Sequence, residues 1–85
     1  MEKEQFALRL AQLRQAKGVS ARDMSLSLGQ SAGYINNIEN GVSLPSMSMF
    51  FYICDYLGVS PAEFFTPELS DPVALQTLTG ELRRL

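Results

Sequence analysis

The chain of 85 residues contains no histidine and only one cysteine. Histidine is the side chain that most often serves as a general acid or base near neutral pH, and it is also the commonest metal ligand. Because Cys54 has no second cysteine to pair with, an internal disulfide is excluded, which fits a reducing cytosol. The sequence also lacks a glycine-rich phosphate loop and any cluster with metal-ligand spacing. We therefore expect no enzyme activity, no cofactor and no metal site.

Long hydrophobic runs are absent as well. No run approaches the roughly 18 apolar residues that a membrane helix needs. Residues 1–4 lack the basic and then apolar pattern of a signal peptide. Apolar residues make up 46% of the chain, which is enough for the core of one small domain. These features predict a cytoplasmic protein without membrane association, and they indicate no small-molecule ligand.

Positive charge is scarce in most of the chain, whose net charge is −2. Residues 1–18 hold four basic and two acidic residues, whereas residues 19–82 hold seven acidic residues and Arg22 as their only cation. Non-specific DNA affinity comes largely from lysine and arginine side chains that displace counterions from phosphates. Any DNA binding by this chain therefore has little non-specific affinity to draw on.

What the chain does contain is regular punctuation for short helices. Apolar residues three and four apart predict a helix over residues 3–17, which Gly18 ends. Four further helical segments are predicted to end near residues 28, 39, 57 and 65. Each begins after a serine that is suited to capping, and the last of them opens with a capping box: Ser20, Ser31, Ser46 and Ser60.

A sixth helix is predicted beyond these segments. Asp71 and Pro72 open it, and its leucines recur in steps of three and four, the spacing at which helices pair: Leu75, Leu78, Leu82 and Leu85. We expect a helical domain over residues 1–66, followed by a linker and a dimerisation or packing helix over residues 67–85.

The centre of the chain has the pattern of a helix–turn–helix. Met24 and Leu28 give the first helix an apolar face, and Ile35 and Ile38 do the same for the second. Gly29 lies where the chain must turn sharply between them. Two helices joined by so short a turn cross steeply, so the second can project outward into a DNA groove. DNA binding is therefore the leading hypothesis, and these four apolar residues are predicted to lie in the core.

An ordered set of motifs over roughly residues 6–65 resembles the phage-repressor-like (XRE-type) helix–turn–helix family. The resemblance implies an all-α, five-helix DNA-binding domain in which the third helix, residues 31–39, contacts the major groove, usually as a dimer. The motifs that carry it, in chain order, are Gly18-Val-Ser20, Leu28-Gly29, Ser31, Tyr34-Ile35, Ile38-Glu39-Asn40-Gly41, Pro45-Ser46, Leu57-Gly58-Val59-Ser60 and Phe64-Phe65.

The resemblance also implies an ion pair between Arg14 and Glu39, which would tie the first helix to the end of the third. The alternative is that both are ordinary surface charges. Losing one partner of a partly buried pair leaves a charge uncompensated. Arg14 is accordingly predicted to matter more for stability than Arg9.

The residues predicted to face DNA are all small or uncharged. Asn37 is expected to contribute most, because asparagine pairs with adenine through two hydrogen bonds. Tyr34 has two interpretations: packing over the corner between the two helices, or a hydroxyl contact to phosphate. The predicted DNA-binding set is Gln30, Ser31, Ala32, Gly33, Tyr34, Asn36, Asn37 and Asn40.

The segment over residues 46–57 carries more apolar surface than one core requires. Its inward stripe is predicted to be Met47, Phe50, Ile53, Cys54 and Leu57. The surplus is expected to be covered either by the sixth helix of the same chain or, as we favour, by a second chain in a homodimer. The predicted dimer or packing residues are Met49, Phe51, Tyr52, Tyr56, Leu75, Leu78 and Leu82.

Two functions remain in competition at this level. The first is a sequence-specific transcriptional regulator that binds double-stranded DNA as a homodimer. The second is a protein-interaction module that keeps the helix–turn–helix fold with weak or no DNA binding. Its support is the acidic balance together with Ala21, Ala32 and Gly33, which stand where the family commonly has longer polar side chains.

Overall fold

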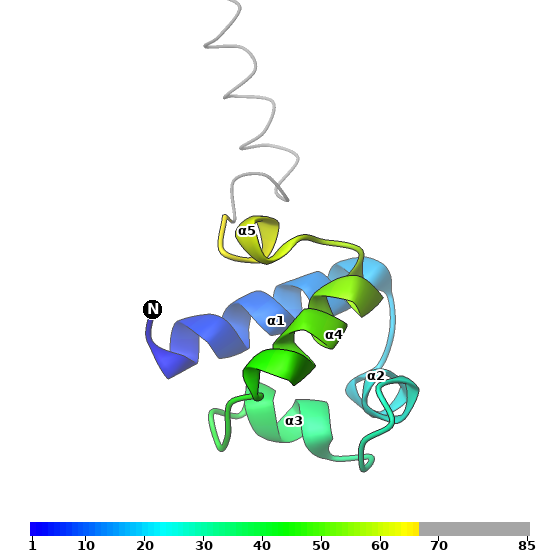
Figure 1. Ribbon diagram of the computed structural model, residues 1–85. Coiled ribbons are helices and arrows are strands. Elements are labelled where there is room, and N and C mark those ends of the chain that lie inside the picture. Colours follow the sequence, from blue (N-terminus) through cyan, green and yellow to red (C-terminus); the bar gives the residue numbers. More distant parts are fainter. Residues whose placement is uncertain (67–85) are drawn as a thin grey trace, which may run out of the picture.

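The computed structural model describes residues 1–66, and within them the chain forms five α-helices and no strand (Figure 1). This confirms the predicted all-α fold. The predicted sixth helix over residues 71–85 lies outside the described residues. In chain order the helices are α1 (Lys3–Lys17), α2 (Ala21–Ser27), α3 (Tyr34–Glu39), α4 (Met47–Leu57) and α5 (Pro61–Phe64).

Most helix boundaries follow from local capping chemistry. The hydroxyl oxygens of Ser20, Ser46 and Ser60 each accept the backbone N–H three residues later, at the start of α2, α4 and α5. Gly18 and Gly58 end α1 and α4 with φ of 80° and 74°, a left-handed conformation that side chains disfavour. The predicted capping box at Ser60 is also present. These boundaries confirm the helix caps and helix ends that were predicted from the sequence.

The start of α3 was predicted wrongly, because the helix begins at Tyr34 and not after a cap at Ser31. The carbonyl of Ser31 accepts the Tyr34 N–H at 3.1 Å, so residues 31–33 form a turn. Gly33 is the N-cap, and glycine inside a helix costs about 1 kcal/mol relative to alanine. The helix therefore begins directly after Gly33.

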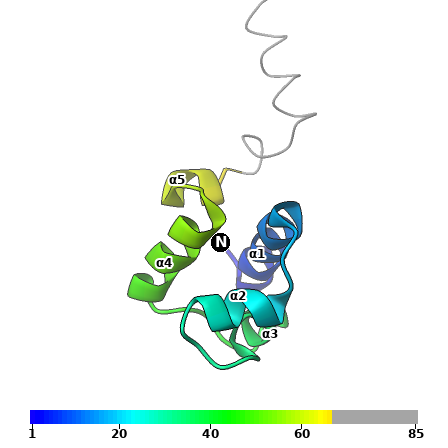
Figure 2. The same cartoon turned by 90° about the vertical axis from the view of Figure 1, so that its right-hand side faces the viewer.

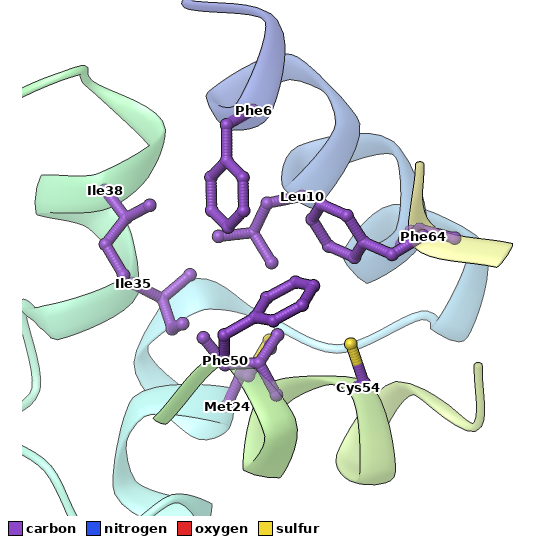
Figure 3. Packing of buried hydrophobic residues seen from close by; sticks show 10 residues of the cluster. Phe6, Leu10, Met24, Ile35, Ile38, Phe50, Cys54 and Phe64 are labelled. Atoms are coloured by element: carbon purple, nitrogen blue, oxygen red, sulfur yellow. The ribbon is translucent and has the colours of Figure 1, made fainter. Parts of the chain in front are cut away.

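All five helices contribute to one core (Figure 3). Met24, Ile35 and Ile38 are buried as predicted, while Leu28 is partly buried and packs against them. The core is closed by side chains from α1, α4 and α5: Phe6, Leu10, Leu13, Phe50, Ile53, Cys54 and Phe64. The two helices of the helix–turn–helix are thus held by the rest of the domain, since α2 and α3 are too short to be stable in isolation.

The predicted inward position of Met47 was wrong, because this side chain is 68% exposed. The buried side chains of α4 are Phe50, Ile53 and Cys54, a narrower stripe than the sequence suggested. Met47 occupies the first turn of α4 and lines a surface groove instead of the core. Leu57, at the other end of the same helix, is only partly buried.

An aromatic cluster and a buried arginine attach α5 to α1. The ring of Phe64 lies 4.9 Å from that of Phe6 and 5.1 Å from that of Phe50, measured between centroids. Arg9 is only 6% exposed, and its guanidinium donates to the carbonyls of Glu63 at 2.8 Å and Phe64 at 2.6 Å. Those carbonyls belong to the last turn of α5, where a helix leaves carbonyls without an N–H of its own to accept, and the Glu63 carbonyl also accepts the Thr66 N–H at 3.1 Å. Arg9 therefore acts as a C-terminal cap from a distant part of the chain.

The helix–turn–helix and α5 lie at opposite ends of the domain (Figures 1 and 2). In both views α2 and α3 form one end, α5 forms the other, and α1 and α4 run between them. None of the helices in the described part of the chain is long and apolar enough to cross a membrane.

Candidate nucleic-acid interface

One face of α3 is polar and exposed, directly opposite the face that enters the core. Gly33, Asn36, Asn37 and Asn40 are exposed and stand at i, i+3, i+4 and i+7, so they form a single stripe along the helix. Ile35 and Ile38 are fully buried on the other side. We call these four exposed residues the asparagine stripe. It is the surface that a docked α3 would present to a DNA groove.

The carboxamides of the asparagine stripe have no partners of their own. Among residues 1–66, no hydrogen bond joins the side chain of Asn36, Asn37 or Asn40 to another residue. Each carboxamide can donate through its nitrogen and accept through its oxygen. The stripe therefore offers three donor–acceptor pairs to a ligand without breaking any internal hydrogen bond.

Gly33 opens the stripe and is not required by the fold. Its φ of −93° suits any residue, and no atom lies within 4 Å of where a Cβ would be placed. The absent side chain therefore leaves open space at the start of α3. A backbone or base edge of a ligand can approach there more closely than it could against a larger residue.

A buried serine fixes α3 against α2. The Ser25 hydroxyl donates to the Ala21 carbonyl at 2.7 Å and accepts the Ile35 N–H at 2.9 Å. Ile35 is the second residue of α3, and its N–H is one of the donors that a helix start leaves unpaired. Gly33 has no side chain to cap it, so Ser25 supplies the cap from the neighbouring helix. This contact sets the angle at which the asparagine stripe is presented.

The predicted ion pair between Arg14 and Glu39 is present. The guanidinium contacts the two carboxylate oxygens at 2.6 and 3.0 Å, and the side chains are 16% and 11% exposed. A third bond runs from Arg14 to the Val19 carbonyl at 2.8 Å. The hydrogen bond with Glu39 raises the pKa of Arg14 above its usual value, although burial opposes the shift. Arg14 therefore joins α1 to both the start of α2 and the end of α3.

In the turn before α3, three residues predicted to face DNA differ from one another in exposure and contacts. Ser31 is exposed and Ala32 is partly buried. The Gln30 amide nitrogen lies 3.6 Å from the sulfur of Met49, so this contact directs Gln30 toward α4. Ser31 is the residue of the turn that presents a hydroxyl to solvent.

Tyr34 packs over the corner of the two helices. It is partly buried against the core, in agreement with the packing interpretation. Burial raises the pKa of its phenol, so the hydroxyl stays protonated near neutral pH. A protonated hydroxyl remains a hydrogen-bond donor.

Most cationic side chains of the described residues make contacts within the protein. Arg9 and Arg14 are bonded within the protein, and the Lys17 ammonium lies 4.9 Å from the centroid of the Tyr56 ring. Arg22, in the first turn of α2, is exposed. The interface thus has hydrogen-bonding capacity but little positive charge.

Sequence reasoning missed two polar residues that hold the site, Ser25 and Arg9. Ser25 lies beside Met24 on the short first helix of the motif, and Arg9 lies three residues after Phe6 and four before Leu13, next to the apolar stripe of α1. Their position beside buried apolar residues was the signal available. Their partners, Ile35 and residues 63–64, are distant along the chain and carry no local pattern.

Comparison with known proteins agrees with the geometry. No curated protein gives a significant match to the chain. The structure is similar to that of the restriction-modification controller protein C.AhdI from Aeromonas hydrophila, with 28% identity, a TM-score of 0.68, and coverage of 74% of this chain and 91% of that one. It is similar as well to the clp gene regulator ClgR from Corynebacterium glutamicum, with 29% identity, a TM-score of 0.69, and coverage of 96% and 86%.

A family model described as helix–turn–helix matches residues 10–64, which is more than half of the chain. The matched range contains α2, α3 and α4, together with the Arg14–Glu39 pair. The chain therefore belongs to the XRE-type helix–turn–helix family and is a DNA-binding transcription regulator.

Proposed function

We propose that this regulator recognises specific DNA sequences by inserting α3 into the major groove. The observation that carries the proposal is the asparagine stripe, which is exposed and whose side chains make no hydrogen bond within residues 1–66, while the opposite face of α3 is fully buried. A major groove admits one α-helix, and base edges within it offer donors and acceptors to polar side chains. Ser31, which is exposed, and the hydroxyl of the partly buried Tyr34 are expected to add polar contacts.

We propose further that the chain acts as a homodimer in the cytoplasm. The surplus apolar side chains of α4 divide between two faces. Met49, Tyr52 and Tyr56 line a hollow with Leu28 of α2, whereas Phe51 shares its side of α4 with Met47, one turn away. The second side borders an apolar groove of about 200 Å³, lined by Phe6, Leu44, Pro45, Met47, Phe50 and Phe65.

Exposed apolar surface of this kind is typical of an interface. Four large apolar side chains in and beside this part of the surface are exposed: Leu44, Met47, Phe51 and Phe65. Together with the leucine stripe of residues 75, 78 and 82, they supply the apolar area that we propose two chains bury between them. A symmetric dimer would also bring two copies of α3 to one DNA molecule.

The test combines selection with one designed variant. The intact chain is used to select bound sequences from a random duplex library, and binding of the selected site is measured over a salt series. Gly33→Asp places a negative charge at the start of the stripe, where it suits the helix dipole and space is open. We expect its melting temperature to be unchanged or slightly higher and its binding to the selected site to be lost.

The matched control is Gln12→Glu, which adds the same charge at an exposed position of α1. We expect it to bind the selected site within a few-fold of the wild-type chain.

Because few cations are available, the salt dependence of binding should be shallow for this fold.

The competing function, a protein-interaction module, is favoured by one observation, the scarcity of uncommitted cations near α3. The protein-interaction module would be supported by a selection that enriches no sequence and by undetectable duplex binding at low salt. That result would refute sequence-specific recognition.

A further inference from the structure

We propose that the asparagine stripe recognises adenines in the operator and that methylation of adenine N6 weakens binding. The inference rests on the proposed function, since it specifies which bases α3 contacts once it occupies the major groove. It makes DNA methylation a means of regulating this protein.

The stripe contains only groups that both donate and accept. In the major groove adenine presents an acceptor at N7 beside a donor at N6, which one carboxamide matches with two hydrogen bonds. Guanine presents two acceptors, N7 and O6, which arginine or lysine matches best. Neither lysine nor arginine occurs between Asp23 and Asp71. The Arg14 guanidinium is held by Glu39 and Val19, and Arg22 is on α2.

The spacing of the stripe suits adjacent base pairs. Asn36 and Asn40 are four residues apart, which corresponds to a rise of about 6 Å along an α-helix. Two base-pair steps of about 3.4 Å cover nearly the same distance. Asn37 lies between them on the same face. Each half-site is therefore expected to hold at least two A·T pairs within about three consecutive positions.

Methylation removes one half of each adenine contact. Adenine N6 carries two hydrogens, of which one pairs with thymine and the other points into the major groove. A methyl group that preserves base pairing replaces the hydrogen in the groove. The asparagine oxygen then loses its donor and meets a methyl group, while the bond to N7 is left without its companion. A good bidentate contact discriminates by about 1–3 kcal/mol, so each affected adenine should weaken binding by roughly 5- to 150-fold.

The experiment uses the intact chain and the site selected from the random library. Three versions of the duplex are compared: unmodified, with N6-methyladenine at one adenine at a time, and with 7-deaza-adenine at the same positions, which removes the N7 acceptor. We expect both modifications to weaken binding at the contacted adenines. The same modifications at adenines outside the half-sites should have no effect.

Asn37→Ala identifies the protein partner of the contact. Asn37 is exposed and makes no side-chain hydrogen bond within the described residues, so the variant should melt as the wild type does. We expect it to bind the unmodified site more weakly and to lose sensitivity to modification at one adenine while keeping it at the others.

The outcomes separate this inference from the function on which it rests. Selected sites without adenines in the half-sites, or full binding to every modified duplex, would overturn adenine recognition while sequence-specific binding still stood. A selection that enriches no sequence would instead overturn the proposed function, and adenine recognition with it.

Discussion

The two ends of the domain share one core but present opposite chemistry to their surroundings. At the end formed by α2 and α3, most exposed side chains carry amides or hydroxyls, alongside Arg22, Asp23 and the half-exposed Leu26. At the α5 end, the exposed Phe65 borders an apolar groove that also includes Leu44, from the loop before α4, and Met47, from the first turn of α4. Hydrogen-bonding groups suit a nucleic acid and apolar groups suit a protein, and this contrast is the basis on which we propose DNA at the first end and a second chain at the other.

Two arginines of α1 secure these two ends by different means. Arg14 binds a carboxylate at the end of α3, whereas Arg9 binds two backbone carbonyls at the end of α5. Both side chains are largely removed from solvent. The ends can therefore be weakened separately, and each prediction below perturbs one of them.

The largest effect is expected from Arg14→Ala. It leaves the Glu39 carboxylate, which is 11% exposed, without its partner, and breaking such a pair costs about 3–5 kcal/mol when it is buried. We expect a loss of a few kcal/mol in the free energy of unfolding, measured by urea denaturation. Arg9→Ala should also lower the free energy of unfolding, by roughly 1–3 kcal/mol, because the buried carbonyl of Phe64 loses its bond to the Arg9 guanidinium.

Arg22→Ala is the control for both variants, since Arg22 is exposed on α2. We expect its unfolding free energy to change by less than about 0.5 kcal/mol. If Arg14→Ala were no more destabilising than Arg22→Ala, the role of the ion pair in fixing α3 would be wrong.

Ser25→Ala should weaken the end formed by α2 and α3. The variant leaves the buried Ile35 N–H without an acceptor, which costs about 1–3 kcal/mol. We expect lower stability and weaker binding to the selected site, because α3 loses the contact that sets its angle. Ser27→Ala, an exposed change on the same helix, is the matched control and should alter neither measurement. Equal melting temperatures for the two variants would contradict a capping role for Ser25.

Phe51→Glu should weaken the opposite end without affecting the core, since Phe51 is 50% exposed. On the proposed homodimer, a carboxylate at a buried interface is costly, and we expect the dimer dissociation constant to rise at least tenfold, about 1.4 kcal/mol. Tyr52→Glu changes the other face of α4 and should have a smaller effect. Sedimentation of the intact chains makes the comparison, and a wild-type chain that stays monomeric at all concentrations would rule out the dimer.

The smallest effect concerns pH and the α5 capping box. Hydrogen bonds from the Ser60 backbone and side chain lower the pKa of the Glu63 carboxyl from its usual 4.5. A lowered folded-state pKa adds stability above pH 4.5 that is lost as the pH falls through the folded-state value. The melting temperatures of the wild type and Glu63→Gln should therefore differ near pH 7 and converge as the pH falls below the folded-state pKa of Glu63. A constant difference across that range would exclude the carboxylate as its source.

The sequence by itself determined the features that depend on neighbouring residues. The caps at Ser20, Ser46 and Ser60 and the ends at Gly18 and Gly58 were all predicted correctly, because capping is decided within three or four residues. The buried positions of Met24, Ile35 and Ile38 followed from helical spacing. The Arg14–Glu39 pair was predicted from the family resemblance and is confirmed.

The tertiary structure decided what depends on residues distant in the chain. In the structure α3 begins at Tyr34 and not after a cap at Ser31, because Ser25 of the neighbouring helix caps Ile35. Met47 is exposed, since the face of α4 that packs into the core is narrower than the apolar composition of the helix indicates. Arg9 is buried, and its acceptors lie 54 and 55 residues away. Burial and long-range hydrogen bonds depend on how the helices pack, and that packing has no local signal in the sequence.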